Sequence, residues 1–264
     1  MPAKPTHTKP IRLPGKLLPR SFFERPPEQV APLLLGKLLV RKWDAGTVVG
    51  GRIVEVEAYL GPHNDPPDPA AHAHRGPTPR NQVLFGPAGH AYVYSIYGQY
   101  FCMNISCEVE GQAGCVLLRA LEPVAGVEVM ALNRGVAKVK NASGAKASVP
   151  LAAGSARRKS CPDTTCPGRG GETEIGFALR ELTSGPSRLC QALGLTRAEH
   201  NGLDLLSPGL SLQVRDDGFV AHEYVVTPRI GIRHAVERPL RFALPGHVCV
   251  SGPKSLTGKR VFLG

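Results

Sequence analysis

The feature that most constrains the fold is the segment 52–60, where apolar and polar side chains follow the two-residue period of a β-strand. Glu55 and Glu57 lie two residues apart and therefore point to the same side, together with Ile53 and Tyr59. From spacing alone we favour a position of Glu55 and Glu57 on a solvent-facing strand edge. The alternative is a pocket in which surrounding loops orient one carboxylate for proton transfer.

Further short elements lie on both sides of this strand. Prolines at the start and glycines after the end predict helices at 26–35 and 184–194. Apolar runs predict further strands at 38–40, 91–96, 115–121, 210–215, 221–227 and 239–244, and we expect Glu122 and Pro123 to end the third. These elements predict a mixed, strand-rich body.

The formal net charge of +11 comes from two segments. Residues 1–25 hold six basic residues and one acidic residue, residues 133–172 hold eight and two, and the rest of the chain is balanced. Both segments have few large apolar side chains, which predicts disorder. We therefore expect a basic disordered tail at 1–20, a folded domain at 21–250 with a disordered insert at about 133–173, and a C-terminal tail at 251–264.

The sequence also limits the compartment. No apolar run reaches the roughly 18 residues that span a bilayer, and no secretory signal precedes Phe22. The seven cysteines lack the spacing of a disulfide framework. We expect an intracellular protein with reduced thiols and no membrane association.

Several polar side chains are candidates for chemistry. Tyr92, Tyr94, Tyr97 and Tyr100 fall within nine residues, which fits a packed sheet face as well as a surface that stacks on nucleobases. Arg119 ends an apolar run and needs an anionic partner, for which Glu55 or Glu57 is available.

A metal site is the weaker interpretation of the histidines. His72 and His74, with Asp68 upstream, would supply two imidazoles and a carboxylate to a metal-dependent hydrolase. This pair lacks a defined third ligand, so we predict no metal. A further limit on the chemistry is that no lysine occurs between Lys42 and Lys138, which leaves this stretch without a Schiff-base nucleophile.

The order and spacing of seven motifs resemble the alkyladenine (3-methyladenine) DNA glycosylases of the mammalian type. The resemblance runs from about residue 22 to 133 and from about 180 to 244. The motifs are GRIVEVEAYLGP at 51–62, AAH at 70–72, TPRN at 78–81, YVY at 92–94 followed by YG at 97–98, YFCMNIS at 100–106, VLLRALEP at 116–123 and SGPS at 184–187.

The resemblance implies a fold and a reaction. The fold is a single α+β domain with a curved, mainly antiparallel sheet flanked by helices, similar to the C-terminal domain of formyltransferases. The reaction is monofunctional base excision, in which a damaged purine is flipped out of duplex DNA and its N-glycosidic bond is hydrolysed, leaving an abasic site. Expected substrates are 3-methyladenine, 7-methylguanine, hypoxanthine and ethenoadenine. The 133–173 insert is longer than the family leads us to expect.

The resemblance also assigns roles to residues. Glu57 matches the general base that activates a water, Arg119 matches a second contact of that water, and the backbone at Ile230 matches a third. Tyr97 matches the side chain inserted into the duplex. The expected base pocket consists of Tyr59, His72, Tyr92, Tyr94 and Asn104, the last of which disfavours guanine. Arg75, Arg80 and Arg188 are expected to contact the DNA backbone.

The same resemblance implies no cofactor and a monomer whose partner is double-stranded DNA, with abasic-site repair enzymes acting downstream. We expect the protein to lie with DNA inside the cell, and we favour the nucleus of a eukaryote over the cytoplasm or nucleoid of a bacterium. A rival hypothesis from a different class is a non-catalytic, basic nucleic-acid-binding protein whose tail and insert coat the polymer.

Overall fold

The computed structural model describes residues 13–43, 46–136, 139–140, 146–147, 179–252 and 258–262. Residues 1–12 of the tail expected at 1–20, and most of the 133–173 insert, lie outside these residues. Within the insert, the short strands β7 (Val139–Lys140) and β8 (Lys146–Ala147) pair with each other. In the described part of the chain no helix is long and apolar enough to cross a membrane.

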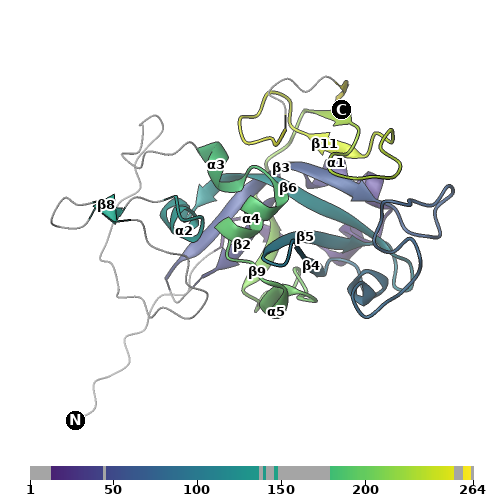
Figure 1. The fold of residues 1–264 in the computed structure, drawn as a ribbon, viewed down its shortest axis with the longest axis horizontal. Coiled ribbons are helices and arrows are strands. Elements are labelled where there is room, and N and C mark those ends of the chain that lie inside the picture. Colours follow the sequence, from purple (N-terminus) through teal and green to yellow (C-terminus); the bar gives the residue numbers. More distant parts are fainter. Residues whose placement is uncertain are drawn as a thin grey trace, which may run out of the picture.

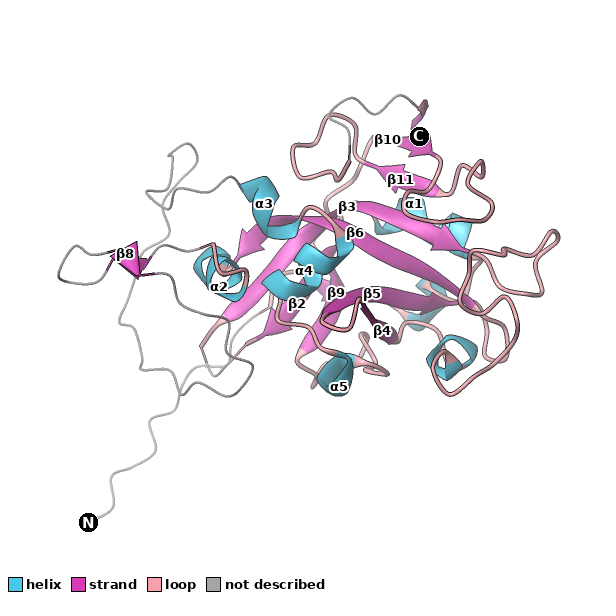
Figure 2. Ribbon diagram, in the orientation of Figure 1, coloured by secondary structure: helices cyan, strands magenta, loops and turns pink. Residues whose placement is uncertain are grey.

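One antiparallel sheet of ten strands forms the centre of the molecule (Figures 1 and 2). Its main path is β1-β9-β2-β3-β11-β10-β12, and a branch runs from β3 through β6 and β5 to β4. The strands are β1 (Lys16–Leu17), β2 (Leu38–Lys42), β3 (Val48–Tyr59), β4 (Ala91–Ile96), β5 (Tyr100–Cys107), β6 (Gly114–Ala125), β9 (Leu212–Asp216), β10 (Glu223–Thr227), β11 (Arg241–Ala243) and β12 (Lys259–Phe262). The predicted mixed α+β fold with a mainly antiparallel sheet is confirmed.

Short helices flank this sheet (Figure 2). Pro27 at the first turn of α1 and Pro186 at the first turn of α4 have no backbone N–H to leave unpaired, which favours helix initiation at both sites. The helices are α1 (Pro27–Leu34), α2 (Val127–Asn133), α3 (Leu179–Thr183), α4 (Pro186–Ala192) and α5 (Arg197–His200), with 3-10 turns η1 (Arg20–Phe22) and η2 (Gln82–Phe85).

β3 is the central strand, and its two edges are both occupied. β2 and β11 pair with successive parts of one edge, while β6 pairs along the other. Ile53 and Val56 of β3 pack with Leu118 and Leu121 of β6 in the main hydrophobic core. Our expectation of a solvent-facing edge at Glu55 and Glu57 is therefore wrong, and both carboxylates have 0% exposure.

β6 continues beyond the residues that we expected to end it. The strand passes Glu122 and Pro123 and ends at Ala125. Opposite Gly50 and Gly51 of β3 the register shifts, so that Val124 is left over as a bulge. A proline can sit at a bulge because its missing N–H is not required by the ladder there.

The hairpin between β4 and β5 was only half predicted. β4 covers the predicted residues 91–96, whereas β5 was missed. The connection runs through Tyr97 and Gly98, which both adopt positive φ (50° and 75°). Tyr97 therefore lies at the hairpin tip.

The two expected tails contribute ordered structure. β1 pairs with β9, so residues 16–17 belong to the sheet instead of a disordered tail. At the other end, β12 pairs with β10, and Ser251 is buried. Each pairing covers an exposed strand edge, which is why ordered structure extends past both boundaries.

Close backbone packing explains the glycine that follows β3. A Cβ added to Gly61 would lie 1.7 Å from the carbonyl oxygen of Ala113. We expect Gly61→Ala to lower the free energy of unfolding by at least about 1–3 kcal/mol, because the backbone must shift to admit the methyl group. Chemical denaturation measures this difference. Gly209→Ala is the control, since no atom lies within 4 Å of its added Cβ, and an equal loss in both variants would contradict the steric explanation.

Candidate functional site

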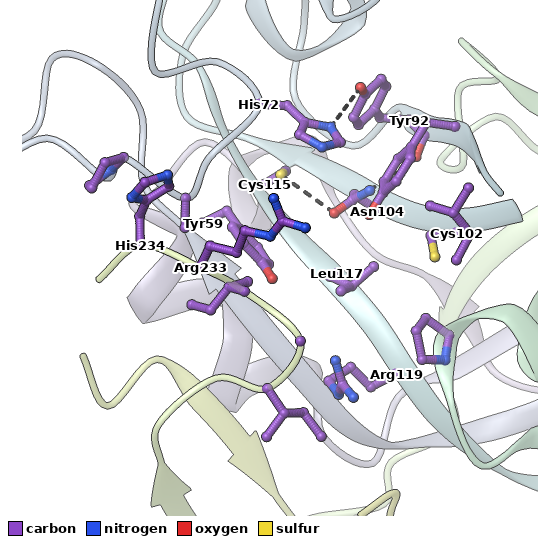
Figure 3. Close-up of a pocket in the computed structure, with 18 of the residues that line it drawn as sticks. Tyr59, His72, Tyr92, Cys102, Asn104, Cys115, Leu117, Arg119, Arg233 and His234 are labelled. Atoms are coloured by element: carbon purple, nitrogen blue, oxygen red, sulfur yellow. Dashed lines mark hydrogen bonds between the residues drawn. The ribbon is translucent and has the colours of Figure 1, made fainter. Parts of the chain in front are cut away.

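A cavity of about 710 Å³ opens where the β4–β5 hairpin, β3, β6 and the loop after β10 meet (Figure 3). Its wall is mainly aromatic and apolar, with a few polar groups. The lining residues are Tyr59, Pro69, Ala70, His72, Tyr92, Tyr94, Ile96, Tyr97, Cys102, Asn104, Cys115, Leu117, Arg119, Pro186, Ile230, Gly231, Ile232, Arg233 and His234.

Glu57 lies directly behind this wall and is surrounded by hydrogen-bond donors. The Tyr59 hydroxyl donates to Oε2 at 3.0 Å, and the backbone N–H of Ile230 donates to Oε1 at 2.9 Å. Nη1 of Arg119 lies 3.1 Å from Oε2. Arg119 and the backbone of Ile230, the two groups predicted to act together with Glu57, therefore both contact its carboxylate.

Arg119 is held between both glutamates of β3. Its Nε donates to Oε1 of Glu55 at 2.8 Å while Nη1 faces Glu57. Burial opposes the charge of Arg119, but the nearby carboxylates of Glu57 and Glu55 prevail and raise its pKa. Glu55 and Glu57 were the two predicted partners of Arg119, and Arg119 contacts both.

Rings form the upper wall of the cavity. The His72 ring centroid lies 4.5 Å from that of Tyr94 and 5.8 Å from that of Tyr92, and both contacts are edge-to-face. Tyr92 and Tyr94 are stacked with centroids 5.4 Å apart. Tyr59 lies across the cavity from His72 and Tyr92 (Figure 3). All four predicted ring residues of the base pocket thus line one cavity.

The surroundings of His72 favour its neutral form. Partial desolvation of the ring and the charge of Arg80 lower the pKa of His72. Its Nδ1 lies 2.9 Å from the Tyr92 hydroxyl (Figure 3). Burial raises the pKa of Tyr92 to about 12, so this hydroxyl stays protonated.

The side-chain amide of Asn104, which lines the cavity, is held by two hydrogen bonds. Its Nδ2 donates to the Tyr92 carbonyl oxygen at 3.3 Å, and the Cys115 thiol donates to its Oδ1 at 3.6 Å (Figure 3). These two contacts set the orientation of the amide, since a swap of its N and O atoms would lose both.

The residues predicted to contact DNA lie on the outside. Tyr97 is 90% exposed at the rim of the cavity. Arg75, Arg80 and Arg188 are exposed, and the Arg80 guanidinium lies 5.6 Å from the centroid of the Tyr94 ring. Their contacts with DNA stay predictions.

A buried ion pair that the sequence analysis missed joins two loops of the cavity. Nη1 and Nη2 of Arg229 donate to Oδ2 and Oδ1 of Asp68 at 2.5 and 2.9 Å. The Arg229 guanidinium also lies 4.6 Å from the centroid of the Tyr59 ring. The two residues are 161 positions apart, and no local pattern marks them as partners.

This pair also bears on the metal hypothesis. Both oxygens of Asp68 accept hydrogen bonds from Arg229 and from the backbone N–H groups of Leu60 and Ala70. The described residues contain no group of three or more His, Cys, Asp or Glu side chains that would hold a metal ion. His72, His74 and Asp68 therefore do not form the ligand set of that alternative.

Comparison with known proteins identifies the family of this chain. A family model described as Methylpurine-DNA glycosylase (MPG) matches residues 21–248. The chain therefore belongs to the methylpurine-DNA glycosylase family, whose members are DNA glycosylases that act in DNA repair.

Three bacterial relatives share the name "Putative 3-methyladenine DNA glycosylase". The protein from Koribacter versatilis is 44% identical over 239 residues, which cover 90% of this chain and 95% of the relative. Those from Rhodopseudomonas palustris strain BisB18 and Burkholderia lata are 42% and 39% identical, and the aligned residues cover 90% and 92% of this chain and 92% and 94% of the relatives. The family resemblance is confirmed, but these bacterial relatives do not support the mammalian type or the nuclear location.

The ion pair between Asp68 and Arg229 gives a pH-dependent prediction. Burial disfavours the Asp68 carboxylate, but the hydrogen bonds and charge of Arg229 prevail and lower its pKa below the unfolded value of about 4. The pair therefore stabilises the fold above that pH, and its contribution is lost as the pH falls through the folded-state pKa. We expect Asp68→Asn to lower the free energy of unfolding by about 3–5 kcal/mol at pH 7, because it leaves a buried guanidinium without its carboxylate.

Denaturant unfolding at pH 7 and at progressively lower pH tests this effect, and the difference between wild type and Asp68→Asn should shrink in acid. Asp204→Asn is the control, because Asp204 forms a 2.8 Å pair with Arg20 at the surface. Such pairs contribute about 0–1 kcal/mol. If Asp68→Asn lowers the free energy of unfolding by the same amount at every pH, the stabilising role of the ion pair is contradicted.

Proposed function

We propose that this protein is a monofunctional DNA glycosylase that hydrolyses the N-glycosidic bond of alkylated or deaminated purines in double-stranded DNA. The observation that carries the proposal is Glu57, a buried carboxylate bonded by Tyr59, Arg119 and Ile230 directly behind a ring-lined cavity. Its substrates would include 3-methyladenine, 7-methylguanine, hypoxanthine and ethenoadenine. The protein would act as a monomer and leave abasic sites for downstream repair enzymes.

Base recognition begins with flipping of the damaged nucleotide. Flipping costs a few kcal/mol and is cheapest for a poorly paired base, so damage is partly selected before the pocket is reached. Tyr97 is exposed at the hairpin tip beside the cavity and would enter the duplex to replace the lost stacking. The flipped purine would then lie between Tyr59 on one side and His72 and Tyr94 on the other.

Hydrolysis in this arrangement needs one carboxylate. As the bond between the sugar and the base nitrogen breaks, its electron pair leaves with the purine and the sugar gains oxocarbenium character. Glu57 would stabilise that positive charge and accept a proton from a water, whose oxygen bonds to the anomeric carbon. The products are an abasic site and the free base, which leaves as a neutral molecule when the purine is N-alkylated and cationic, and takes up a proton from solvent when the purine is neutral.

The absence of lysine supports hydrolysis over strand cleavage. No lysine occurs between Lys42 and Lys138, and none of the described residues that line the cavity is a lysine. A lyase reaction through a Schiff base requires an amine next to the anomeric carbon, so the proposed enzyme leaves the DNA strand intact.

The central test is Glu57→Gln on a duplex oligonucleotide that carries one ethenoadenine or hypoxanthine. We expect the single-turnover excision rate to fall by about 10²- to 10⁴-fold, the usual range for loss of a general base. Strand scission should appear only after alkali treatment, and EDTA should have no effect. Glu122→Gln is the control, a half-exposed glutamate on the same sheet.

Three outcomes separate the alternatives. Excision that EDTA abolishes and zinc restores would favour the metal-dependent hydrolase. Binding of duplex DNA without any product would favour the non-catalytic binding protein. Full activity of Glu57→Gln would remove Glu57 from the role of general base.

A second prediction concerns Tyr97. Since a base–aromatic stack contributes about 1–3 kcal/mol, we expect Tyr97→Ala to reduce excision from duplex DNA by about tenfold or more. Excision from the same lesion in single-stranded DNA should change less, because no duplex has to be disrupted. Tyr97→Phe keeps the ring and should retain activity, and Val109→Ala is a control at another exposed apolar residue. Equal losses on both substrates would contradict the proposed role.

A further inference from the structure

Glu55 is a buried charge next to the candidate site that the proposed mechanism does not use. It has no exposed surface, yet it accepts four hydrogen bonds. Nε of Arg119 donates at 2.8 Å and Nε of Arg241 at 2.7 Å. The backbone N–H of Ser251 donates at 2.6 Å and its hydroxyl at 2.8 Å. All four contacts come from protein donors, and Glu55 does not line the cavity, so we assign it no part in proton transfer to or from the substrate.

Glu55 and Ser251 together fix the orientation of the Arg119 guanidinium. With Nε on Glu55 and Nη2 donating to the Ser251 hydroxyl at 3.2 Å, two sides of the guanidinium are fixed. Because the group is planar and rigid, these contacts also determine where Nη1 lies, 3.1 Å from Oε2 of Glu57.

Charge balance gives Glu55 a second effect on this arrangement. Two carboxylates, Glu55 and Glu57, are buried with two guanidiniums, Arg119 and Arg241. Arg241 also donates to the carbonyl oxygen of Ser251 at 2.7 Å and to the Thr227 hydroxyl at 3.2 Å. Arg241 thus offsets the charge of Glu55, and Arg119 stays available to Glu57. A buried network of this kind is stable only when each member is paired.

We propose that Glu55 and Ser251 are positioning residues of this glycosylase, which hold Arg119 in the orientation that catalysis at Glu57 requires. The inference rests on the proposed function. It also assigns a role to the segment after β11, because Ser251 contributes its N–H, hydroxyl and carbonyl to the network. The segment between β11 and β12, which carries Ser251, is therefore part of the site.

The test compares excision rate with DNA affinity for Glu55→Gln and Ser251→Ala. Single-turnover rates are measured on an ethenoadenine duplex with saturating enzyme, and affinity is measured on a duplex with a tetrahydrofuran abasic analogue. Misplacement of a catalytic group by about 1 Å can reduce rates 10²-fold. We expect a loss of about 10²-fold for Glu55→Gln and about tenfold for Ser251→Ala, with affinity within about twofold of wild type. Ser251→Ala keeps the backbone N–H bond and is the milder change.

This design separates positioning from folding. Unfolded enzyme lowers the amount of active protein but not the saturated rate constant of the folded fraction. Ser106→Ala is the matched control, because its buried hydroxyl accepts from His90 N–H at 2.9 Å and donates to the Pro87 carbonyl at 3.1 Å, and we expect its rate to match wild type. Wild-type rate constants in Glu55→Gln and Ser251→Ala would overturn the positioning role while the proposed function stands. An inactive wild type would overturn both.

Discussion

Two carboxylates on one strand share a single arginine, and the rest of the candidate site is arranged around that contact. Glu55 and Glu57 lie two residues apart on β3, and both contact Arg119 of the neighbouring strand β6. Burial of these charges is costly unless each one is paired. The pairing of β11 with β3 brings in Arg241 as the second cation, so the order of the strands in the sheet is also the order that balances the charge.

The cavity above this network combines rigid strands with two loops. Strands carry the groups whose position matters most for the proposed chemistry, Glu57 and Arg119. The loops carry His72 and Ile230, and the pair of Asp68 and Arg229 joins them beneath Tyr59. Loops tolerate changes in sequence, whereas strand positions are fixed by the ladder. One buried ion pair thus gives both loops a fixed place relative to the strands.

The sequence predicted the local elements better than the contacts between them. The bounds of β4 and the proline-initiated helices α1 and α4 follow from patterns within a few residues. The burial of Glu55 does not, because alternation shows which residues share a face but not whether that face is covered. β6 was expected to end before Glu122 and Pro123. The bulge that lets the strand continue depends on its partner strand β3, which the local sequence does not reveal. Family resemblance supplied the cavity residues, but Asp68 and Arg229 carry no local signal of their pairing.

The charges beneath the cavity imply how the proposed reaction would be controlled. Asp68, Glu55 and Glu57 are matched by Arg229, Arg241 and Arg119, so this buried set is neutral as a whole. At long range, a set of charges that is neutral as a whole attracts a positively charged base no more strongly than an uncharged base. The reason is that the fields of paired charges fall off quickly with distance. Positive charge that develops on the sugar would therefore be stabilised mainly by the one carboxylate adjacent to it. Under these conditions the orientation of Glu57 and Arg119 matters more than the total charge, and the surrounding pairs act by holding that orientation.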